Sequence, residues 1–165
     1  MRKIIRRVQF KRRRQHSTNY LARAKKLKGR VPRLVVRRTN RYILAQIVTS
    51  EIAQDKVIFT ASSKELMKYG WPKTKSIKNL AAGYLLGVLC AVKAKKADIE
   101  MAILDLGLFR STKGNRIYAV VKGAVDGGLD VPHSEEILPP MERIKRQDLK
   151  TKVDVDEIRE KIQNA

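Results

Sequence analysis

The segment that most restricts the fold of this chain is an apolar stretch near its middle. Leu80 to Val92 holds 13 residues without a charge, too few to cross a bilayer, which needs about 20. We therefore expect a helix from about Ser76 to Lys96 that is buried against a sheet. Gly83 and Gly87 within it match a membrane dimerisation motif in spacing, but close packing in a soluble helix explains them better.

The segment before this helix predicts three strands. Arg33–Arg38 and Tyr42–Thr49 are rich in β-branched and apolar residues and flank a bend at Thr39–Arg41, which is typical of a hairpin. Lys56–Thr60 has the same character and predicts a third strand. The central helix can pack on the sheet that these strands form.

The segment after the helix predicts a further strand, a helix and a last short strand. Glu100–Leu106 reads as a buried strand, and Arg116–Ala124 as a helix that the pair Gly127-Gly128 ends. The reversal there requires at least one residue with positive φ, which glycine adopts without strain. With Leu129–Val131 as a short strand, the order predicts an α/β domain with a mixed sheet covered by helices.

The charge of the chain is distributed very unevenly. Lys and Arg number 37 against 16 Asp and Glu, for a net charge of +21. The first 50 residues contain 17 of these cations and no acid, so the remaining 20 cations face all 16 acids. A polyanion is the expected partner, and nucleic acid and an anionic membrane both fit the total charge. We expect the cationic N-terminal extension to order on binding.

Within this extension, Ser17 and Thr18 are plausible caps of a helix that ends at Gly29. Its apolar residues, Tyr20, Leu21, Ala24 and Leu27, share one face, so that face is expected to dock on protein while the cations face a polyanion. A merely solvated helix is the alternative, but solvated faces usually mix both charge signs.

The end of the chain is polar from Glu135 onward, with a last helix predicted at Asp154–Gln163. The expected organisation is a basic extension (1–30), one α/β core domain (31–134) and a polar tail (135–165). A single cysteine, Cys90, excludes an internal disulfide and suits a reducing compartment. No apolar stretch follows the basic N-terminus, so we expect a soluble, cytoplasmic protein.

Three segments carry a resemblance to a known family. They are Lys122–Ser134 (KGAVDGGLDVPHS), Pro32–Tyr42 (PRLVVRRTNRY) and Ile77–Gly87 (IKNLAAGYLLG). Together they resemble the archaeal and eukaryotic large-subunit ribosomal protein eighteen family, which binds 5S rRNA. The resemblance implies a five-stranded mixed sheet with a ribonuclease H-like layout and an N-terminal arm laid on 5S rRNA. It also implies a place in the central protuberance of the large ribosomal subunit.

The partners expected on this basis are 5S rRNA, 23S-type rRNA and neighbouring 5S-binding proteins, with no membrane and no small-molecule substrate. Arginine can pair with phosphates and stack on bases, and short polar loops can contact the backbone and 2′-OH groups. Phe10, Tyr20 and Tyr42 are candidate stacking residues, with core packing as the equal alternative. The predicted RNA-binding residues are Arg6, Arg7, Lys11, Arg12, Arg13, Arg14, Tyr20, Arg23, Lys25, Lys26, Arg30, Arg33, Arg37, Arg38, Thr39, Asn40, Lys73, Thr74, Lys75, Ser76, Lys113 and Arg116.

Two other functions are alternatives. A metal-dependent nuclease would need several carboxylates around one site, and of the candidates Asp98, Glu100, Asp105, Asp126 and Asp130 only Asp105 is expected near a possible cleft. The histidines lack cysteine partners at metal-binding spacing and no phosphate-binding loop is present, so no catalytic residue, metal or cofactor is predicted. Nonspecific coating of nucleic acid is the second alternative, because charge alone carries such binding.

Overall fold

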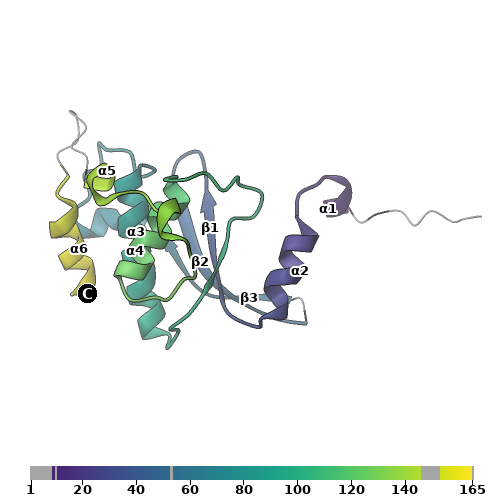
Figure 1. Cartoon of the computed structure of the whole chain (residues 1–165). Helices are drawn as coiled ribbons and strands as arrows, with labels where there is room; N and C mark the ends of the chain where they lie inside the picture. The colour runs from purple at the N-terminus through teal and green to yellow at the C-terminus, as the bar shows by residue number, and fades with distance from the viewer. Residues whose placement is uncertain (1–8, 10, 53, 146–152, 165) are drawn as a thin grey trace, which may run out of the picture.

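The protein folds as a mixed β-sheet with the central helices packed on one face (Figure 1). A computed structural model describes residues 9, 11–52, 54–145 and 153–164. The α/β class predicted from the sequence is confirmed. The elements in chain order are α1 (Lys11–Arg14), α2 (Tyr20–Lys28), β1 (Arg33–Arg38), β2 (Ile43–Glu51), β3 (Gln54–Ser62), the 3-10 helix η1 (Ser63–Tyr69), α3 (Leu80–Lys96), β4 (Ile103–Asp105), α4 (Arg116–Asp126), the 3-10 helix η2 (Glu135–Ile137), α5 (Met141–Lys145) and α6 (Val155–Gln163).

The sheet has the strand order β3-β2-β1-β4. The antiparallel pairs β1–β2 and β2–β3 confirm the predicted hairpin and third strand, and β4 runs parallel to β1. The hairpin bend is closed by Thr39, whose backbone N–H donates to the Tyr42 carbonyl at 2.9 Å. The same carbonyl accepts a hydrogen bond from the Thr39 hydroxyl at 2.7 Å, which fixes the turn.

The predicted fifth strand is not found among the described residues. Leu129–Val131 pairs with the chain before β4 only at an isolated bridge between Met101 and Asp130. Two backbone hydrogen bonds hold this bridge, and Pro132 follows directly and offers no N–H to extend the pairing. The strand predicted at Glu100–Leu106 is correspondingly shortened to the three residues of β4.

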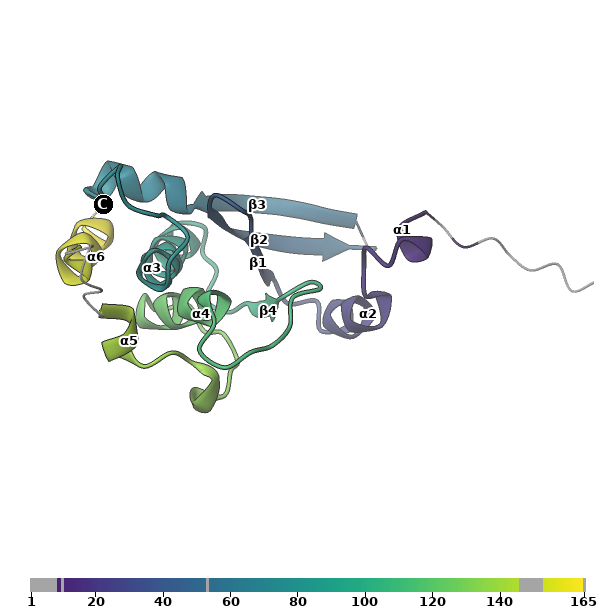
Figure 2. The same cartoon turned by 90° about the horizontal axis from the view of Figure 1, so that it is seen from above.

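Helices α3 and α4 lie side by side on one face of the sheet (Figure 2). α3 begins at Leu80, later than predicted, because Asn79 caps it by accepting a hydrogen bond from the N–H of Ala82. A Cβ atom built on Gly87 would lie 2.1 Å from the carbonyl oxygen of Val120, and one built on Gly123 would lie 1.9 Å from that of Tyr84. The two backbones therefore touch, which confirms the predicted close approach of the central helix.

The reversal after α4 also follows the prediction. Gly127 ends the helix with ordinary φ, and Gly128 adopts φ of +97°, the conformation expected at one of the two glycines. The N–H of Leu129 then donates to the carbonyl of Ala124 at 2.9 Å. His133 lies in the turn that follows, with Nδ1 2.6 Å from the Val131 carbonyl oxygen, so it has a structural partner.

The two ends of the described chain lie at opposite ends of the molecule, with α2 far from α6 (Figures 1 and 2). The last helix was predicted correctly and is capped by Asp154. Its residues Val155, Ile158 and Ile162 are buried in the hydrophobic core, so this part of the predicted tail completes the domain. The boundaries at residues 30 and 134 stay predictions.

Candidate nucleic-acid interface

The outer face of the sheet, away from α3 and α4, carries charged residues near one end. Side chains alternate along β1, so Leu34 and Val36 enter the core while Arg33, Val35 and Arg37 face outward. The register pairs Val35 with Asp105 of β4, so Asp105 shares the outer face. Asp55 of β3 reaches the same region, because its carboxylate binds Arg33.

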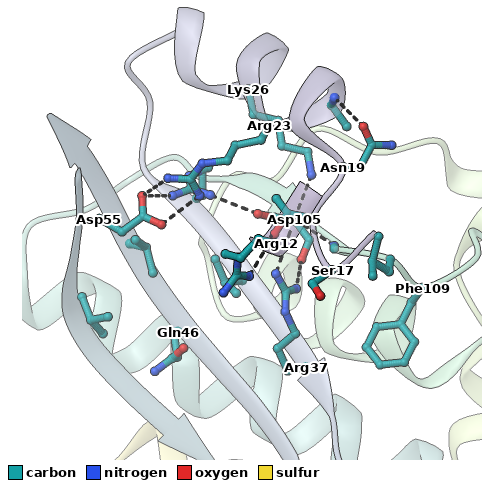
Figure 3. A pocket seen from close by; sticks show the side chains of 18 residues that line it. Arg12, Ser17, Asn19, Arg23, Lys26, Arg37, Gln46, Asp55, Asp105 and Phe109 are labelled. Carbon is teal, nitrogen blue, oxygen red and sulfur yellow. Dashed lines mark hydrogen bonds and ion pairs between the residues drawn. The ribbon is translucent and has the colours of Figure 1, made fainter. Parts of the chain in front are cut away.

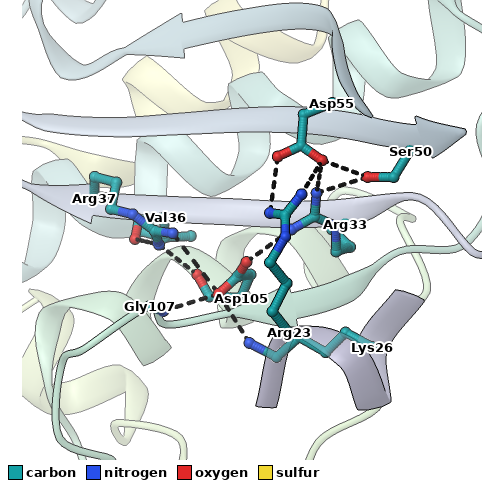
Figure 4. A network of polar contacts seen from close by, with 9 residues as sticks. All are labelled: Arg23, Lys26, Arg33, Val36, Arg37, Ser50, Asp55, Asp105 and Gly107. Atoms are coloured by element: carbon teal, nitrogen blue, oxygen red, sulfur yellow. Dashed lines mark hydrogen bonds and ion pairs between the residues drawn. The ribbon is translucent and has the colours of Figure 1, made fainter. Parts of the chain in front are cut away.

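Helix α2 is attached to this face by ion pairs (Figure 4). Arg23 donates two hydrogen bonds to the carboxylate of Asp55, at 2.8 and 2.9 Å, and Lys26 donates to Asp105 at 2.8 Å. Arg33 lies between the two carboxylates and donates to Asp55 at 2.7 Å and to Asp105 at 3.0 Å. The helix is thus joined to both β3 and β4 by charge.

The pKa values of both carboxyl groups reflect this arrangement. Hydrogen bonds from Arg23 are the main cause that lowers the pKa of Asp55 to about 2. Burial opposes the charged form of Asp105, but hydrogen bonds from Lys26 and from the N–H of Gly107 outweigh it, so its pKa is also lowered. Both groups are therefore carboxylates at neutral pH.

The predicted orientation of α2 is wrong. Leu21, assigned to the docking face, is 81% exposed, and Tyr20 is exposed as well. The side chains of Arg23 and Lys26 face the sheet instead, because they form ion pairs there with the carboxylates of Asp55 and Asp105. The cap is also one residue later than predicted, since Asn19 rather than Ser17 or Thr18 accepts the hydrogen bond from the N–H of Ala22.

A second correction concerns Arg33, which the sequence places among the RNA-binding residues. The residue is only 2% exposed, and its guanidinium also donates to the hydroxyl of Ser50 at 2.8 Å. Its role in this structure is to hold the two carboxylates that bind α2. Arg37 is half-buried beside it and donates to the carbonyl oxygens of Val36 and Asp105.

A hollow of about 500 Å³ lies between the N-terminal helices and the outer face of the sheet (Figure 3). Val35, Val48 and Val57 form its apolar floor, while Arg12 and Arg37 line its sides. Arg12 is held by two hydrogen bonds to the hydroxyl of Thr18, at 2.9 and 3.1 Å. The four cations of the ion-pair cluster, Arg23, Lys26, Arg33 and Arg37, exceed its two carboxylates, so the surroundings stay positive.

The other predicted residues fall into four groups, of which the last is Lys113 and Arg116. Arg6 and Arg7, together with the stacking candidate Phe10, lie outside the described residues. Lys73, Thr74, Lys75 and Ser76 belong to the loop before α3, which lies away from α2 (Figure 2). The exposed residues around α1, α2 and the hairpin bend are Lys11, Arg13, Arg14, Lys25, Arg30, Arg38, Thr39 and Asn40.

Lys113 lies in the loop before α4, and Arg116 is the first residue of that helix. Lys113 pairs with Glu136 at 3.0 Å on the surface. Between them and β4, the loop residues Leu108, Phe109 and Arg110 line hollows that the sequence did not assign to the interface. The sequence shows that Arg110 lies in a loop. Which residues lie next to Arg110 is decided by the pairing of β4 with β1, which the sequence does not show.

Two of the carboxylates that a nuclease would need, those of Asp105 and Asp126, are used for structure. Asp105 is bound by Lys26 and Arg33, and Asp126 accepts a hydrogen bond from the hydroxyl of Tyr84 at 2.9 Å. Over the described residues, no group of three or more His, Cys, Asp or Glu side chains is placed to hold a metal ion. Cys90 is buried, and this burial raises the pKa of its thiol to about 12, as suits an inert core residue.

Asp105→Asn is expected to lower the free energy of unfolding by about 2 kcal/mol at pH 7, because hydrogen bonds to a charged group are lost. Both carboxyl groups have a lowered pKa in the folded state, so their stabilisation is present above the ordinary carboxyl pKa of about 4 and is lost as the pH falls below it, in the case of Asp55 toward about 2. Thermal unfolding of the parent protein and of the Asp105→Asn variant between pH 7 and pH 2 measures the loss of stability and its pH dependence. Equal stability and equal pH profiles would contradict the assigned ion pairs.

The fold and this surface define a class of protein: a small α/β domain whose open sheet face and N-terminal helices present cations to a polyanion. A family described as "Ribosomal large subunit proteins 60S L5, and 50S L18" matches residues 6–102 and 92–134. The chain belongs to this family. Its members are structural components of the ribosome, which confirms the expectation that the chain is not an enzyme.

Individual relatives agree with this assignment. The large ribosomal subunit protein uL18 of Korarchaeum cryptofilum is 56% identical over 138 residues, which cover 84% of this chain and 70% of the relative. The proteins of the same name from Methanoregula boonei and Methanospirillum hungatei are 51% and 50% identical over 138 residues, covering 78% of each relative. Within the described ranges, no helix has the length and hydropathy needed to cross a membrane.

Proposed function

We propose that this chain is a structural constituent of the large ribosomal subunit in the cytoplasm, and that it binds 5S rRNA and helps attach it in the central protuberance. The observation that carries the proposal is the attachment of a cationic helix to the sheet by internal carboxylates. Further proposed partners are 23S-type rRNA and neighbouring 5S-binding proteins.

The attachment of α2 sorts its cations into two sets. Arg23 and Lys26 face the sheet and hold the helix. Lys25 and Lys28 are exposed on its other side, and the cations of α1 precede them without an acidic residue in the first 50 positions. A helix fixed in this way presents its outward cations in one orientation before RNA arrives, which reduces the entropic cost of binding.

A second candidate is nonspecific coating of nucleic acid, which the acid-free N-terminal segment alone would allow. The bend of the β1–β2 hairpin favours specific recognition of RNA instead. Thr39 and Asn40 are exposed there, in a turn fixed by hydrogen bonds to Tyr42. Short polar groups held in place suit contact with the 2′-OH groups that distinguish RNA from DNA.

Binding to isolated 5S rRNA should depend steeply on salt. If about 6 to 10 phosphates are neutralised, the affinity should fall by about three to five decades between 50 and 200 mM salt. Titrations of 5S rRNA and of duplex DNA of equal length test both parts of the proposal. A nearly flat salt dependence would contradict the electrostatic contact, and equal affinity for DNA would favour nonspecific coating.

A further inference from the structure

Three arginines and one aromatic ring line the same hollow, on the side of the domain next to the N-terminal helices. Arg38, Arg110 and Arg116 line a hollow of about 470 Å³ together with Phe109. The guanidinium carbon of Arg38 lies 5.6 Å from the centre of the Phe109 ring. Across the described residues, none of the three arginines has a carboxylate within ion-pair distance. Within the described part of the chain, their positive charges are therefore not paired with an acid.

The 108–115 loop, which carries Phe109 and Arg110, is held in place by several hydrogen bonds. The N–H of Phe109 donates to the Leu106 carbonyl at 3.3 Å, and the N–H of Gly114 donates to the Ile137 carbonyl at 2.9 Å. The hydroxyl of Ser111 is also hydrogen-bonded to that of Tyr118 in α4. The backbone that carries Arg110 is thus fixed on the folded domain.

This hollow adjoins the N-terminal helices. Leu108 is 62% exposed and lines the arginine hollow, the hollow beneath α2 and a third hollow beside α1. The third hollow is lined by Arg13, His16 and Tyr20. A ligand held by the cations of α1 can therefore continue across Leu108 to the arginines without leaving the surface.

We propose that Arg38, Arg110 and Arg116 form an RNA-binding site that takes the phosphate backbone and a stacked base of the same RNA that the N-terminal helices bind. Guanidinium groups bind phosphate through two parallel hydrogen bonds, and the guanidinium plane of Arg38 over Phe109 offers a surface for an unpaired base. This inference rests on the proposed function and extends it, because the site is built from β1, the 108–115 loop and α4, outside the N-terminal extension.

Arg110→Ala should weaken binding of 5S rRNA about tenfold near 0.1 M salt and lower the slope of log affinity against log salt by about 0.7 to 0.9, the value of one phosphate contact. Arg110→Lys keeps the charge and should recover the salt slope but only part of the affinity. The matched control is Lys68→Ala in η1, an exposed cation beside α6 at the other end of the domain. It should leave affinity and slope unchanged.

A tethered cleavage experiment locates the RNA directly. Because Cys90 is buried, Leu108→Cys provides one reactive thiol for an iron chelate that cuts nearby RNA, and Lys68→Cys provides the distant control. We expect cuts at one cluster of 5S rRNA nucleotides from position 108 and none from position 68. Arg110→Ala added to Leu108→Cys should weaken those cuts.

The outcomes separate the two proposals. If the parent protein fails to bind 5S rRNA, both the proposed function and this site are overturned. If the parent binds while Arg110→Ala behaves like Lys68→Ala and position 108 cuts nothing, only this site is overturned. Protection of a label on position 108 by poly-glutamate but not by poly-uridylate would assign the arginines to an acidic protein instead of RNA.

Discussion

Gly123→Ala is expected to lower the free energy of unfolding by about 3 to 5 kcal/mol, more than the usual cost of an extra methyl group in a packed core. The new Cβ would lie 1.9 Å from the carbonyl oxygen of Tyr84 and 3.1 Å from the backbone nitrogen of Val88. Backbone atoms cannot rotate away as a side chain can, so α3 and α4 must separate. The gain of about 1 kcal/mol in helix propensity is too small to compensate.

Gly29→Ala is the matched control, because a Cβ there would lie 3.8 Å or more from every neighbour and φ is −74°. It should melt at or slightly above the temperature of the parent. Gly87→Ala meets α4 from the other side and should behave like Gly123→Ala. Thermal and urea unfolding measure these effects, and a Gly123→Ala protein as stable as the parent would show that the helices do not touch as described.

Removal of residues 1–15 should reduce the affinity for 5S rRNA severely while leaving the domain folded. These residues contain eight Lys and Arg side chains, and if half of them pair with phosphates, the loss is about three decades near 0.1 M salt. The deletion ends before Asn19, so the cap of α2 and the ion pairs of Arg23 and Lys26 are retained.

Two measurements on the shortened protein decide this prediction. The unfolding transition should stay cooperative, with a Tm close to that of the parent, while a titration with 5S rRNA shows the loss. Arg13→Ala alone should also weaken binding of 5S rRNA, but by less than the removal of residues 1–15. A shortened protein that no longer unfolds cooperatively would make the N-terminal residues part of the core, and one that binds as well as the parent would remove them from the interface.

The fold was predictable from sequence where a pattern is local. The β1–β2 hairpin, α4 and α6 follow from alternation, helical periodicity and glycine or acidic caps, and each was found close to its predicted bounds. The predicted fifth strand was not found, because the length of a strand depends on the strand it pairs with as well as on its own residues. Only one bridge at Asp130 could form beside the chain before β4.

The candidate site was predictable in composition but not in arrangement. The cations of the N-terminal segment were identified from charge alone, yet which of them face inward depends on Asp55 and Asp105, which lie 32 and 79 residues from their partners in α2. A helical face rich in Leu and Tyr predicts burial only if an apolar surface faces it. The neighbourhood of Arg110 likewise required the parallel pairing of β4 with β1.

The attachment of α2 by ion pairs has a consequence for how the protein responds to heat and solvent. No residue of this helix is buried, so its release from the sheet exposes little apolar surface. The heat capacity change of unfolding and its denaturant m-value scale with the area exposed, and both come almost entirely from the core around α3 and α4. Detachment of α2 would therefore be nearly silent in calorimetry, while its backbone amides would exchange with solvent far sooner than those of the central helices.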